Sequence, residues 1–595
     1  MTTQAERRDT TVAAISVDQM RGRLRKKSQL KGRQPDHVSM AEVQTLIGPG
    51  PHRRDLLIEN LHKLNDTYRA LHDRHLVALS RQMNVPMAEV FEVATFYHHF
   101  EVLRDGQEPA RLTVRVCDGL SCELRGAQAL LARLPSLLGG DVKVIPAPCV
   151  GRCEQAPVVV IGQAPVAHAD AQHVHAAVEH GASAHPVPPD DAAFDAAAVG
   201  PAAITRSPQE VSPAYVGLKA YRDKGGYQLA ARVMQDALSP DDVIKAMSDS
   251  GLRGLGGAGF PAGRKWGIVR QQPAPRLMAV NIDEGEPGTF KDRTYLERDP
   301  HRFLEGLLIA AKVVGTEACY IYLRDEYHGC RAILERELER LRADPPFPLP
   351  LIELRRGAGA YICGEESAMI ESIEGKRGEP RMRPPYIAQI GLFGRPTLEH
   401  NFETLYWVRD IVERGPAWFS SFGRNGRKGL RSYSVSGRVK EPGVKLAPAG
   451  VTLRELVDEF CGGMQEGHEL YAYLPGGASG GILPASMADI PLDFDTLQPH
   501  GCFIGSAAVI VLSKADKARD AALNMMRFFE HESCGQCTPC RVGTGKAAQL
   551  MQARKWDNKT LEDLNQVMID ASICGLGQAA PNPVRCVQKY FPEEV

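Results

Sequence analysis

The sequence lacks the features of a membrane protein, a secreted protein or a dedicated nucleic-acid binder. No run of its 595 residues approaches the roughly 18 uninterrupted apolar residues of a membrane span; the best candidate, residues 304–314, is broken by Glu305 and Lys312. No apolar core follows the arginines near the N-terminus, so we expect no secretory signal. Lys+Arg is 71 and Asp+Glu is 72, whereas a nucleic-acid binder is normally basic. We therefore expect a cytoplasmic protein without a membrane span or a nucleic-acid partner.

The composition is that of a large globular protein. Hydrophobic residues make up 43% and charged residues 24%, and at about 100–200 residues per domain the length predicts three to five domains. Fourteen cysteines are present. In a reducing compartment these are metal ligands, redox thiols or small buried side chains rather than disulfides.

Local patterns divide the chain into seven segments. A basic tail, which is either a solvated extension or an arm for an acidic partner, precedes a segment whose leucines recur every three to four residues, as in helices. A small unit of alternating strands and helix, a linker rich in Ala, Pro and Asp, a large α/β unit, a β-rich unit and a helical unit follow. The predicted boundaries are 1–39, 40–105, 106–180, 181–205, 206–430, 431–515 and 516–595.

Four cysteines form a first constellation in residues 106–180. Cys117 and Cys122 are separated by four residues, Cys149 and Cys153 by three, and each pair follows a predicted strand. Four thiolates brought together by a small sheet suit zinc or an iron–sulfur cluster. Structural zinc sites usually have tighter spacing, so the wider loops favour a [2Fe–2S] cluster. The alternative is two unrelated pairs of buried thiols.

A second constellation lies in the last 80 residues. Cys534, Cys537 and Cys540 follow one another at intervals of three, so that they can hold three corners of a [4Fe–4S] cluster. Cys574, between glycines, is the expected fourth ligand, and Cys586 is the alternative; structural zinc is the rival metal. The other cysteines are predicted to be mostly small core residues, namely Cys319, Cys330, Cys363, Cys461, Cys502 and Cys586.

Glycine-rich segments indicate a cofactor pocket. Residues 254–259 fit G-x-G-x-x-G, but the preceding segment is predicted to be helical, so an ordinary Rossmann site is not expected. Closely spaced glycines still allow backbone N–H groups to approach a phosphate or a flat ring, with Lys265 nearby as a cation; the alternative is a structural turn. Residues 281–288 add three acids, and 357–367 form a second glycine-rich loop that enters a helix. Acids near a ribose favour NAD over NADP.

The glycine-rich and acidic segments, followed by the second cysteine constellation, make residues 206–595 resemble the flavin- and NADH-binding subunit of respiratory complex I and its relatives. Residues 40–180 resemble the thioredoxin-like [2Fe–2S] partner subunit of that module. The matching runs are 251–266, 281–293, 357–381, 532–541 and 572–577. The resemblance implies a multidomain α/β and α+β fold: an N-terminal helical segment, a thioredoxin-like ferredoxin domain, a Rossmann-like FMN/NAD domain, a β-grasp (SLBB-like) domain and a C-terminal helical bundle with a cluster.

The resemblance also implies site residues. FMN and NAD would be held by Gly254, Gly256, Gly257, Phe260, Lys265, Asn281, Asp283, Glu284, Glu286, Tyr361, Gly364, Glu365, Glu366, Arg383, Tyr386 and Asn401. Phe260 would face the adenine. Arg383, Tyr386 and His400 stand where the family usually has Lys, Phe and Asn; the first two keep the charge and the stacking face. No catalytic side chain is expected, because hydride passes to the flavin. The β-grasp domain is expected to be a spacer without a soluble ligand.

Fused chains of this kind occur in NAD-dependent molybdenum or tungsten formate dehydrogenases and in NAD-reducing hydrogenases. The run 434–443 and the complete first cysteine set resemble the β (diaphorase) subunit of the formate dehydrogenases, since that set is often degraded in the hydrogenase fusions. The resemblance then implies an oxidoreductase that passes electrons from formate, oxidised on an α-type molybdenum- or tungsten-pterin iron–sulfur subunit, through [4Fe–4S] and FMN to NAD+. The [2Fe–2S] cluster would lie off that line. A hydrogenase diaphorase, a fused complex I module and a non-catalytic scaffold are the alternatives.

Overall fold

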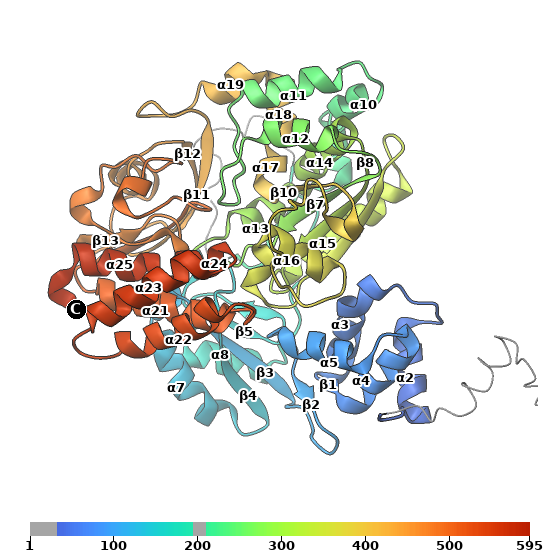
Figure 1. Ribbon diagram of the computed structural model, residues 1–595, viewed down its shortest axis with the longest axis horizontal. Helices are drawn as coiled ribbons and strands as arrows, with labels where there is room; N and C mark the ends of the chain where they lie inside the picture. Colours follow the sequence, from blue (N-terminus) through green and yellow to red (C-terminus); the bar gives the residue numbers. More distant parts are fainter. Residues whose placement is uncertain (1–31, 194–209) are drawn as a thin grey trace, which may run out of the picture.

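The computed structural model describes residues 32–193 and 210–595, which form five units (Figure 1). Most of the predicted basic tail and the second half of the predicted linker lie outside these residues. We call the units the N-terminal helical unit (32–105), the cysteine-loop unit (106–180), the central unit (210–429), the mixed-sheet unit (430–515) and the C-terminal helical unit (516–595). Within the described ranges, no helix combines the length and the apolar character that a membrane crossing needs.

The N-terminal helical unit forms where the leucine periodicity predicts helices. The Asp36 carboxylate accepts the Ser39 N–H and so caps the first helix. Leu57, Leu61 and Leu64 repeat on one face of the second helix and are fully buried. The elements are α2 (His37–Ile47), η1 (Arg54–Leu56), α3 (Leu57–Tyr68), β1 (Leu71–His72), α4 (Asp73–Met83), α5 (Met87–Phe96) and β2 (Val102–Leu103).

The cysteine-loop unit is a four-stranded sheet of order β4-β3-β5-β6, in which β3 runs parallel to β4 and antiparallel to β5. Val114 and Val116 of β3 alternate into the core, as their pattern predicts. Because β3 and β4 are parallel neighbours, the loops after them meet at one edge. The elements are β3 (Leu112–Cys117), α6 (Leu120–Glu123), α7 (Ala127–Leu138), β4 (Val142–Ala147), η2 (Cys153–Gln155), β5 (Val159–Ile161), β6 (Ala164–Val166) and α8 (Ala171–Glu179).

The described part of the predicted linker, residues 181–193, is bonded to both of its neighbours. The Gln163 N–H donates to the Ser183 carbonyl at 2.8 Å, and Asp190 forms an ion pair with Arg340 of the central unit. This stretch is therefore a fixed connection rather than a free tether.

The central unit is built on four parallel strands of order β10-β7-β8-β9. Its cofactor-type crevice is expected where parallel strands end. Asn281 at the end of β7 pairs in register with Asn401 at the end of β10, so the two amides are neighbours. The elements are α9 (Leu218–Asp223), α10 (Gln228–Met234), α11 (Pro240–Asp249), α12 (Ala262–Arg270), β7 (Arg276–Ile282), α13 (Lys291–Leu296), α14 (Pro300–Val314), β8 (Thr316–Leu323), α15 (His328–Ala343), β9 (Leu351–Arg356), η3 (Tyr361–Gly364), α16 (Glu366–Ile373), η4 (Leu392–Gly394), β10 (Thr397–Asn401), α17 (Phe402–Tyr406), α18 (Val408–Arg414) and α19 (Pro416–Ser420).

Helix α11 confirms that the glycine-rich run 254–259 follows a helix and not a strand. Ser239 caps α11 by accepting the Asp242 N–H, and Pro240 stands in its first turn, where a proline is tolerated. The run then leads into α12, which begins at Ala262. The glycine-rich loop therefore joins two helices, which differs from the strand-to-helix turn of an ordinary dinucleotide fold.

The mixed-sheet unit has five strands of order β12-β11-β15-β13-β14. Its elements are β11 (Leu430–Gly437), β12 (Gly443–Pro448), α20 (Leu453–Glu455), η5 (Leu456–Phe460), β13 (Leu470–Leu474), η6 (Ala478–Gly480), β14 (Leu483–Pro484), η7 (Ala485–Met487), η8 (Gln498–His500) and β15 (Ala508–Ser513). The C-terminal helical unit contains α21 (Ala518–Glu532), α22 (Thr538–Met551), α23 (Asn558–Ala571), α24 (Gly575–Ala579), α25 (Pro581–Tyr590) and η9 (Pro592–Glu594). In Figure 1 its helices lie between the mixed-sheet and cysteine-loop units, and Asn524 of α21 donates to the Asp118 carbonyl at 3.0 Å.

Candidate functional site

A cavity of about 520 Å³ opens at the ends of β7 and β10. Its size falls within the roughly 300–1,000 Å³ range of small-molecule and cofactor sites. Ten of the sixteen predicted cofactor residues line it: Gly256, Gly257, Asn281, Asp283, Glu284, Glu286, Tyr361, Gly364, Glu365 and Asn401.

Glycine is required where the first glycine-rich loop meets the strand ends. A Cβ on Gly256 would lie 2.9 Å from the Cβ of Asn401, which is too close for any side chain. The Asn281 side chain donates to the Gly364 carbonyl at 2.9 Å and so fixes the second glycine-rich loop beside the first. Backbone from both loops therefore lines the cavity, and a flat ligand can approach it closely.

Three acids of the run 281–288 take different roles. Asp283 has a shielded Oδ2 without a hydrogen-bond partner among the described residues, and burial raises the pKa of this carboxyl well above its usual range. Glu286 accepts from the Ser479 N–H at 2.8 Å and from the Tyr361 hydroxyl. Glu284 accepts the Asp292 N–H at 2.8 Å, so its carboxylate supports the start of α13.

The unpartnered Oδ2 of Asp283 bears on whether the cavity residues suit a flavin. A buried carboxylic oxygen without a partner is costly unless a ligand supplies a hydrogen-bond donor. FMN carries hydroxyl donors on its ribityl chain, and the glycine loops offer N–H groups for its phosphate. The residues present therefore fit FMN.

Sequence reasoning missed Lys291, which lines the cavity. Lys291 is buried, forms ion pairs with Asp292 at 2.7 Å and Glu403 at 3.1 Å, and has its Nζ 3.3 Å from the Asn401 Oδ1. The predicted cation, Lys265, is not among the lining residues, and its Nζ donates to the Glu399 carbonyl and carboxylate, both at 2.9 Å. The available signal for Lys291 was its place in the matched run 281–293.

Six predicted cofactor residues lie outside the cavity lining: Gly254, Phe260, Lys265, Glu366, Arg383 and Tyr386. Arg383 pairs with Glu365, which lines the cavity, and with Glu366 at 3.0 Å, so it stands at the rim. Phe260 is 39% exposed and Tyr386 is 55% exposed, which leaves both rings open to solvent.

The mixed-sheet unit and the C-terminal helical unit complete the cavity wall, although the former was expected to be a spacer. Their lining residues are Ser479, Phe503, Gly505, Ser506, Gly575, Leu576, Gln578, Ala579 and Asn582. No local pattern indicates this, because the contact depends on how distant units pack.

His400, which departs from the family pattern, points away from the cavity. Its ring is buried and its Nε2 accepts the Trp266 Nε1–H at 2.7 Å. The substitution is therefore accommodated in the core of the central unit.

The first four cysteines come together as one group rather than two pairs. Cys149 Sγ lies 3.3 Å from Cys153 Sγ, and the Cys117 thiol is within hydrogen-bond reach of those of Cys122 and Cys149. All four are at most 6% exposed. Four converging buried thiols without a disulfide fit the predicted [2Fe–2S] cluster.

The second group lies in the C-terminal helical unit. Cys534 and Cys537 are partly exposed, and Cys540 and Cys574 are buried. A Cβ on Gly577 would lie 2.9 Å from the Cβ of Cys540, so the start of α24, where Cys574 stands, packs directly on Cys540. Cys574 is therefore close to Cys540, as the predicted fourth ligand must be.

Cys586, the alternative fourth ligand, is engaged elsewhere. Its Sγ lies 3.4 Å from the Sγ of Cys502 in the mixed-sheet unit. The other cysteines outside the two groups are buried as predicted: Cys319, Cys330, Cys363, Cys461 and Cys502.

Buried contacts join both cysteine groups to the cavity. Arg324 donates to the Cys149 carbonyl at 2.8 Å and to the Glu284 carbonyl, so one guanidinium spans the first group and the cavity wall. The Tyr361 N–H donates to Glu532, two residues before Cys534, at 2.8 Å. The three sites therefore form one connected region.

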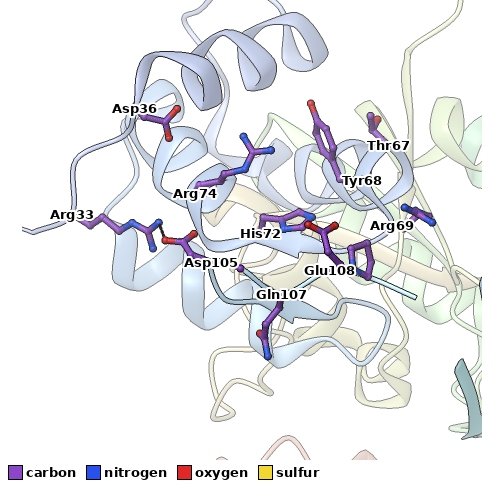
Figure 2. Close-up of a pocket in the computed structure, with 12 residues that line it drawn as sticks. Arg33, Asp36, Thr67, Tyr68, Arg69, His72, Arg74, Asp105, Gln107 and Glu108 are labelled. Atoms are coloured by element: carbon purple, nitrogen blue, oxygen red, sulfur yellow. Dashed lines mark hydrogen bonds and ion pairs between the residues drawn. The ribbon is translucent and has the colours of Figure 1, made fainter. Parts of the chain in front are cut away.

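A second cavity, of about 580 Å³, lies where the N-terminal helical unit meets the first residues of the cysteine-loop unit (Figure 2). Two of its charged side chains form ion pairs, Arg33 with Asp105 and Arg74 with Glu42. It shares no lining residue with the predicted site, so we do not assign it to the same function.

Comparisons with known proteins agree with this geometry. Three family models match: the thioredoxin-like [2Fe–2S] ferredoxin (43–181), the Nuo51 FMN-binding domain (247–410) and the NADH-ubiquinone oxidoreductase-F iron-sulfur binding region (520–595). The chain is 39% identical to an F-type subunit of the NADH-quinone oxidoreductase of Rhizobium meliloti over 392 residues, which is 63% of this chain and 93% of the relative. It is 40% identical to the corresponding F-type subunit of Aquifex aeolicus over 397 residues, covering 64% and 91%.

Solved structures match over a longer range. A chain of an NAD+-reducing [NiFe]-hydrogenase in its H2-reduced state is 33% identical, with a TM-score of 0.77, and the match covers 91% of this chain and 93% of that one. These findings confirm the predicted fold class and the FMN and iron–sulfur cofactors. The chain belongs to the family of F-type (51 kDa) flavoprotein subunits of NADH-quinone oxidoreductase, and it carries a thioredoxin-like [2Fe–2S] ferredoxin fused ahead of the FMN-binding and [4Fe–4S] regions.

Proposed function

We propose that this chain is the NAD-linked diaphorase subunit of a formate dehydrogenase, and that it reduces NAD+ with electrons from formate oxidised on a molybdenum- or tungsten-pterin partner. The observation that carries the proposal is the complete, buried group of Cys117, Cys122, Cys149 and Cys153. The fused formate dehydrogenase chains that this sequence resembles keep this set, whereas the hydrogenase fusions often lose it.

Within this function, the cavity is the flavin and nicotinamide site. Bound FMN supplies the exchange between two-electron hydride chemistry and one-electron carriers, which no side chain here can provide. Asn281 and Asn401 hold the strand ends together, Asp283 offers a free oxygen to a ligand hydroxyl, and Lys291 places a buried positive charge beside Asn401. The mixed-sheet unit closes the wall and limits water in the cavity.

The partner is proposed to dock at the C-terminal helical unit. Cys534 and Cys537 reach the surface there, and the apolar side chains Val542 and Val567 are 47% and 52% exposed. Formate chemistry itself belongs to the partner, since nothing in this sequence resembles a pterin site.

The testing experiment is metal analysis of the complex that co-purifies with this chain. We expect molybdenum or tungsten without nickel, together with formate-driven reduction of NAD+. Nickel without molybdenum or tungsten, with hydrogen-driven reduction, would overturn the proposal.

A hydrogenase diaphorase is the second candidate, because the match to the hydrogenase chain extends over 91% of this chain. A fused complex I module is the third, and its complex would contain none of the three metals. The metal analysis therefore separates all three, and the assignment of the cavity to FMN does not depend on its outcome.

A further inference from the structure

Two histidines and an aspartate meet where the N-terminal helical unit packs on the central unit, outside all the sites described above. His62 and Asp66 lie one turn apart on α3 and face His99, which follows α5. One potential ligand atom from each side chain lies within 4.8 Å of the other two.

The hydrogen bonds of both rings leave one unprotonated nitrogen in each: it has no partner in His62, and in His99 it accepts from the Asn65 amide. His62 Nε2 lies 2.8 Å from the Gly357 carbonyl, which can only accept, so Nε2 carries the proton and Nδ1 has the lone pair. His62 is 2% exposed, and its Nδ1 has no partner among the described residues. A buried acceptor without a partner indicates a missing ligand.

His99 is oriented in the way that metal-binding histidines usually are. Its Nδ1 lies 2.7 Å from a carboxylate oxygen of Asp325, and its Nε2 faces the Asn65 amide at 3.2 Å. Histidines that ligate a metal commonly donate their other N–H to a carboxylate or a backbone carbonyl, which fixes the tautomer and raises the basicity of the ligand. His62 makes this contact with a backbone carbonyl, and His99 makes it with a carboxylate.

Asp66 completes the set with a carboxylate that reaches solvent. Its side chain is 39% exposed and is held by Arg356 at 2.5 Å, and Arg356 also contacts Asp325 at 2.6 Å. Arg331 lies 3.6 Å from Asp325. The two arginines that face the site are thus matched by two aspartates. A cavity of about 700 Å³, lined by His62, Asp66 and Arg356, gives an ion access from solvent.

We propose that His62, Asp66 and His99 bind a divalent ion of the zinc class, with a water molecule as the fourth ligand. Two imidazoles and a carboxylate are usual zinc ligands at about 2.0–2.1 Å, so the three ligand atoms must draw together around the ion and the Asn65 amide must leave His99. The second oxygen of Asp66 keeps its contact with Arg356, as ligating carboxylates usually keep a hydrogen bond.

The ion would tie α3 to the second glycine-rich loop. The His62 ring contacts the Gly357 carbonyl, and the backbone N–H of His99 donates to the Ala358 carbonyl at 3.2 Å. This loop continues to Tyr361 and Gly364 in the cavity wall. The site therefore acts as a structural clip that fixes the loop at the end opposite the cavity.

The test uses the full chain with its iron–sulfur clusters, produced in medium containing zinc and dialysed against a weak chelator. We expect about one zinc per chain by mass spectrometry of the metals, a loss of at least fivefold in both His99→Gln and Asp66→Asn, and no loss in His37→Gln, an exposed histidine of the same unit. Iron content should be equal in all four proteins. X-ray absorption at the zinc edge should show nitrogen and oxygen ligands only.

Three results would overturn the proposal: wild-type protein without zinc, zinc retained by both ligand variants, or a sulfur shell near 2.3 Å, which would place the zinc in a cysteine site. Because Asp66 is partly exposed, Asp66→Asn keeps the test decisive if His99→Gln does not fold. An anomalous difference map at the zinc edge would then locate the ion directly.

Discussion

The two cysteine groups of this chain use the same ligand chemistry in opposite surroundings. Cys117, Cys122, Cys149 and Cys153 are all buried, and residues of the central unit cover their loops. In the second group Cys534 and Cys537 are partly exposed, at the surface of the C-terminal helical unit. The first group is therefore enclosed by this chain, whereas the second is open to solvent.

The two cysteine groups therefore differ in burial and not in the type of ligand. A cluster that exchanges electrons with another subunit must come close to the surface, while an enclosed one can exchange them only within the chain. Buried charge and hydrogen bonds also act more strongly on the enclosed group, because water screens the open one. The following predictions test the contrast, from the largest expected effect to the smallest.

Removing one ligand from each group should separate their roles. Cys540→Ser should lower partner-linked NAD+ reduction by about 10³-fold or more, because the open cluster is lost, whereas Cys149→Ser should lower it by less than about tenfold. NADH oxidation with ferricyanide, which needs the flavin site, should persist in both. Iron content and electron paramagnetic resonance spectra establish which cluster each variant lacks. Equal losses of partner-linked activity in the two variants would break the comparison.

The glycines of the two cysteine loops should differ in their tolerance of alanine. Both have positive φ, +69° at Gly151 and +78° at Gly535. A Cβ on Gly151 would lie 2.3 Å from the hydroxyl oxygen of buried Tyr327, whereas on Gly535 the nearest atom is 3.8 Å away. Gly535→Ala should therefore cost only the backbone strain of about 1–2 kcal/mol. Gly151→Ala should cost about 3 kcal/mol or more, because the Tyr327 hydroxyl is held by Glu284.

Thermal unfolding of the cluster-loaded chain, followed through the visible absorption of the clusters, measures this difference. Gly151→Ala should lower the temperature at which the [2Fe–2S] signal is lost by several degrees more than Gly535→Ala lowers that of the [4Fe–4S] signal. Similar shifts would show that the first loop is less tightly enclosed than its contacts indicate.

The buried arginine beside the first group should tune its reduction potential. Arg324 is 5% exposed and donates to the Cys149 carbonyl, so its charge favours the reduced cluster, which is more negative. Arg324→Gln should lower the [2Fe–2S] potential by an amount on the order of 59 mV, the equivalent of about 1.4 kcal/mol for one electron.

Arg541 is the matched control at the open group. It donates to the Gly535 carbonyl but is exposed, so Arg541→Gln should shift the [4Fe–4S] potential by a smaller amount, because water and salt screen its charge. Redox titration followed by electron paramagnetic resonance measures both. A larger shift at the exposed arginine would contradict the difference in screening.

Local pattern predicted much of this architecture. The alternation at Val114 and Val116 marked a strand, and the leucine spacing marked the N-terminal helices. Each of these signals is contained in a few neighbouring residues, so the sequence alone displays it.

Long-range contacts could not be predicted in the same way. Lys291 and Lys265 are both lysines next to glycine-rich or acidic turns, and only the packing of β10 shows that Lys265 binds Glu399 while Lys291 lines the cavity. The bridging role of Arg324 and the wall residue Ser479 depend on units that are far apart in the sequence. Periodicity carries no information about such contacts.

The same contrast between enclosed and open groups applies to a single carboxyl in the cavity. Burial raises the pKa of Asp283 above its usual value near 3.8, so the folded chain holds this proton more tightly than the unfolded chain does. The resulting stabilisation is complete below about pH 4 and is lost as the pH rises through the raised pKa. In flavin-free protein, Asp283→Asn should not lose stability in this way as the pH rises. The melting temperature of the variant minus that of the wild type should therefore increase from pH 5 to pH 8.

The flavin-loaded protein should show the opposite preference. If the free Oδ2 of Asp283 accepts a hydrogen bond from FMN, the amide is a poorer acceptor, and Asp283→Asn should release flavin more readily during gel filtration. Asp223→Asn, at an exposed position in the same unit, should change neither property. If the variant is stabilised at high pH yet retains flavin as well as wild type, the raised pKa of Asp283 is supported, but Asp283 does not contact the flavin. If the melting temperature of the variant follows that of the wild type at every pH, water reaches the Oδ2. This part of the cavity would then be as open as the second cysteine group.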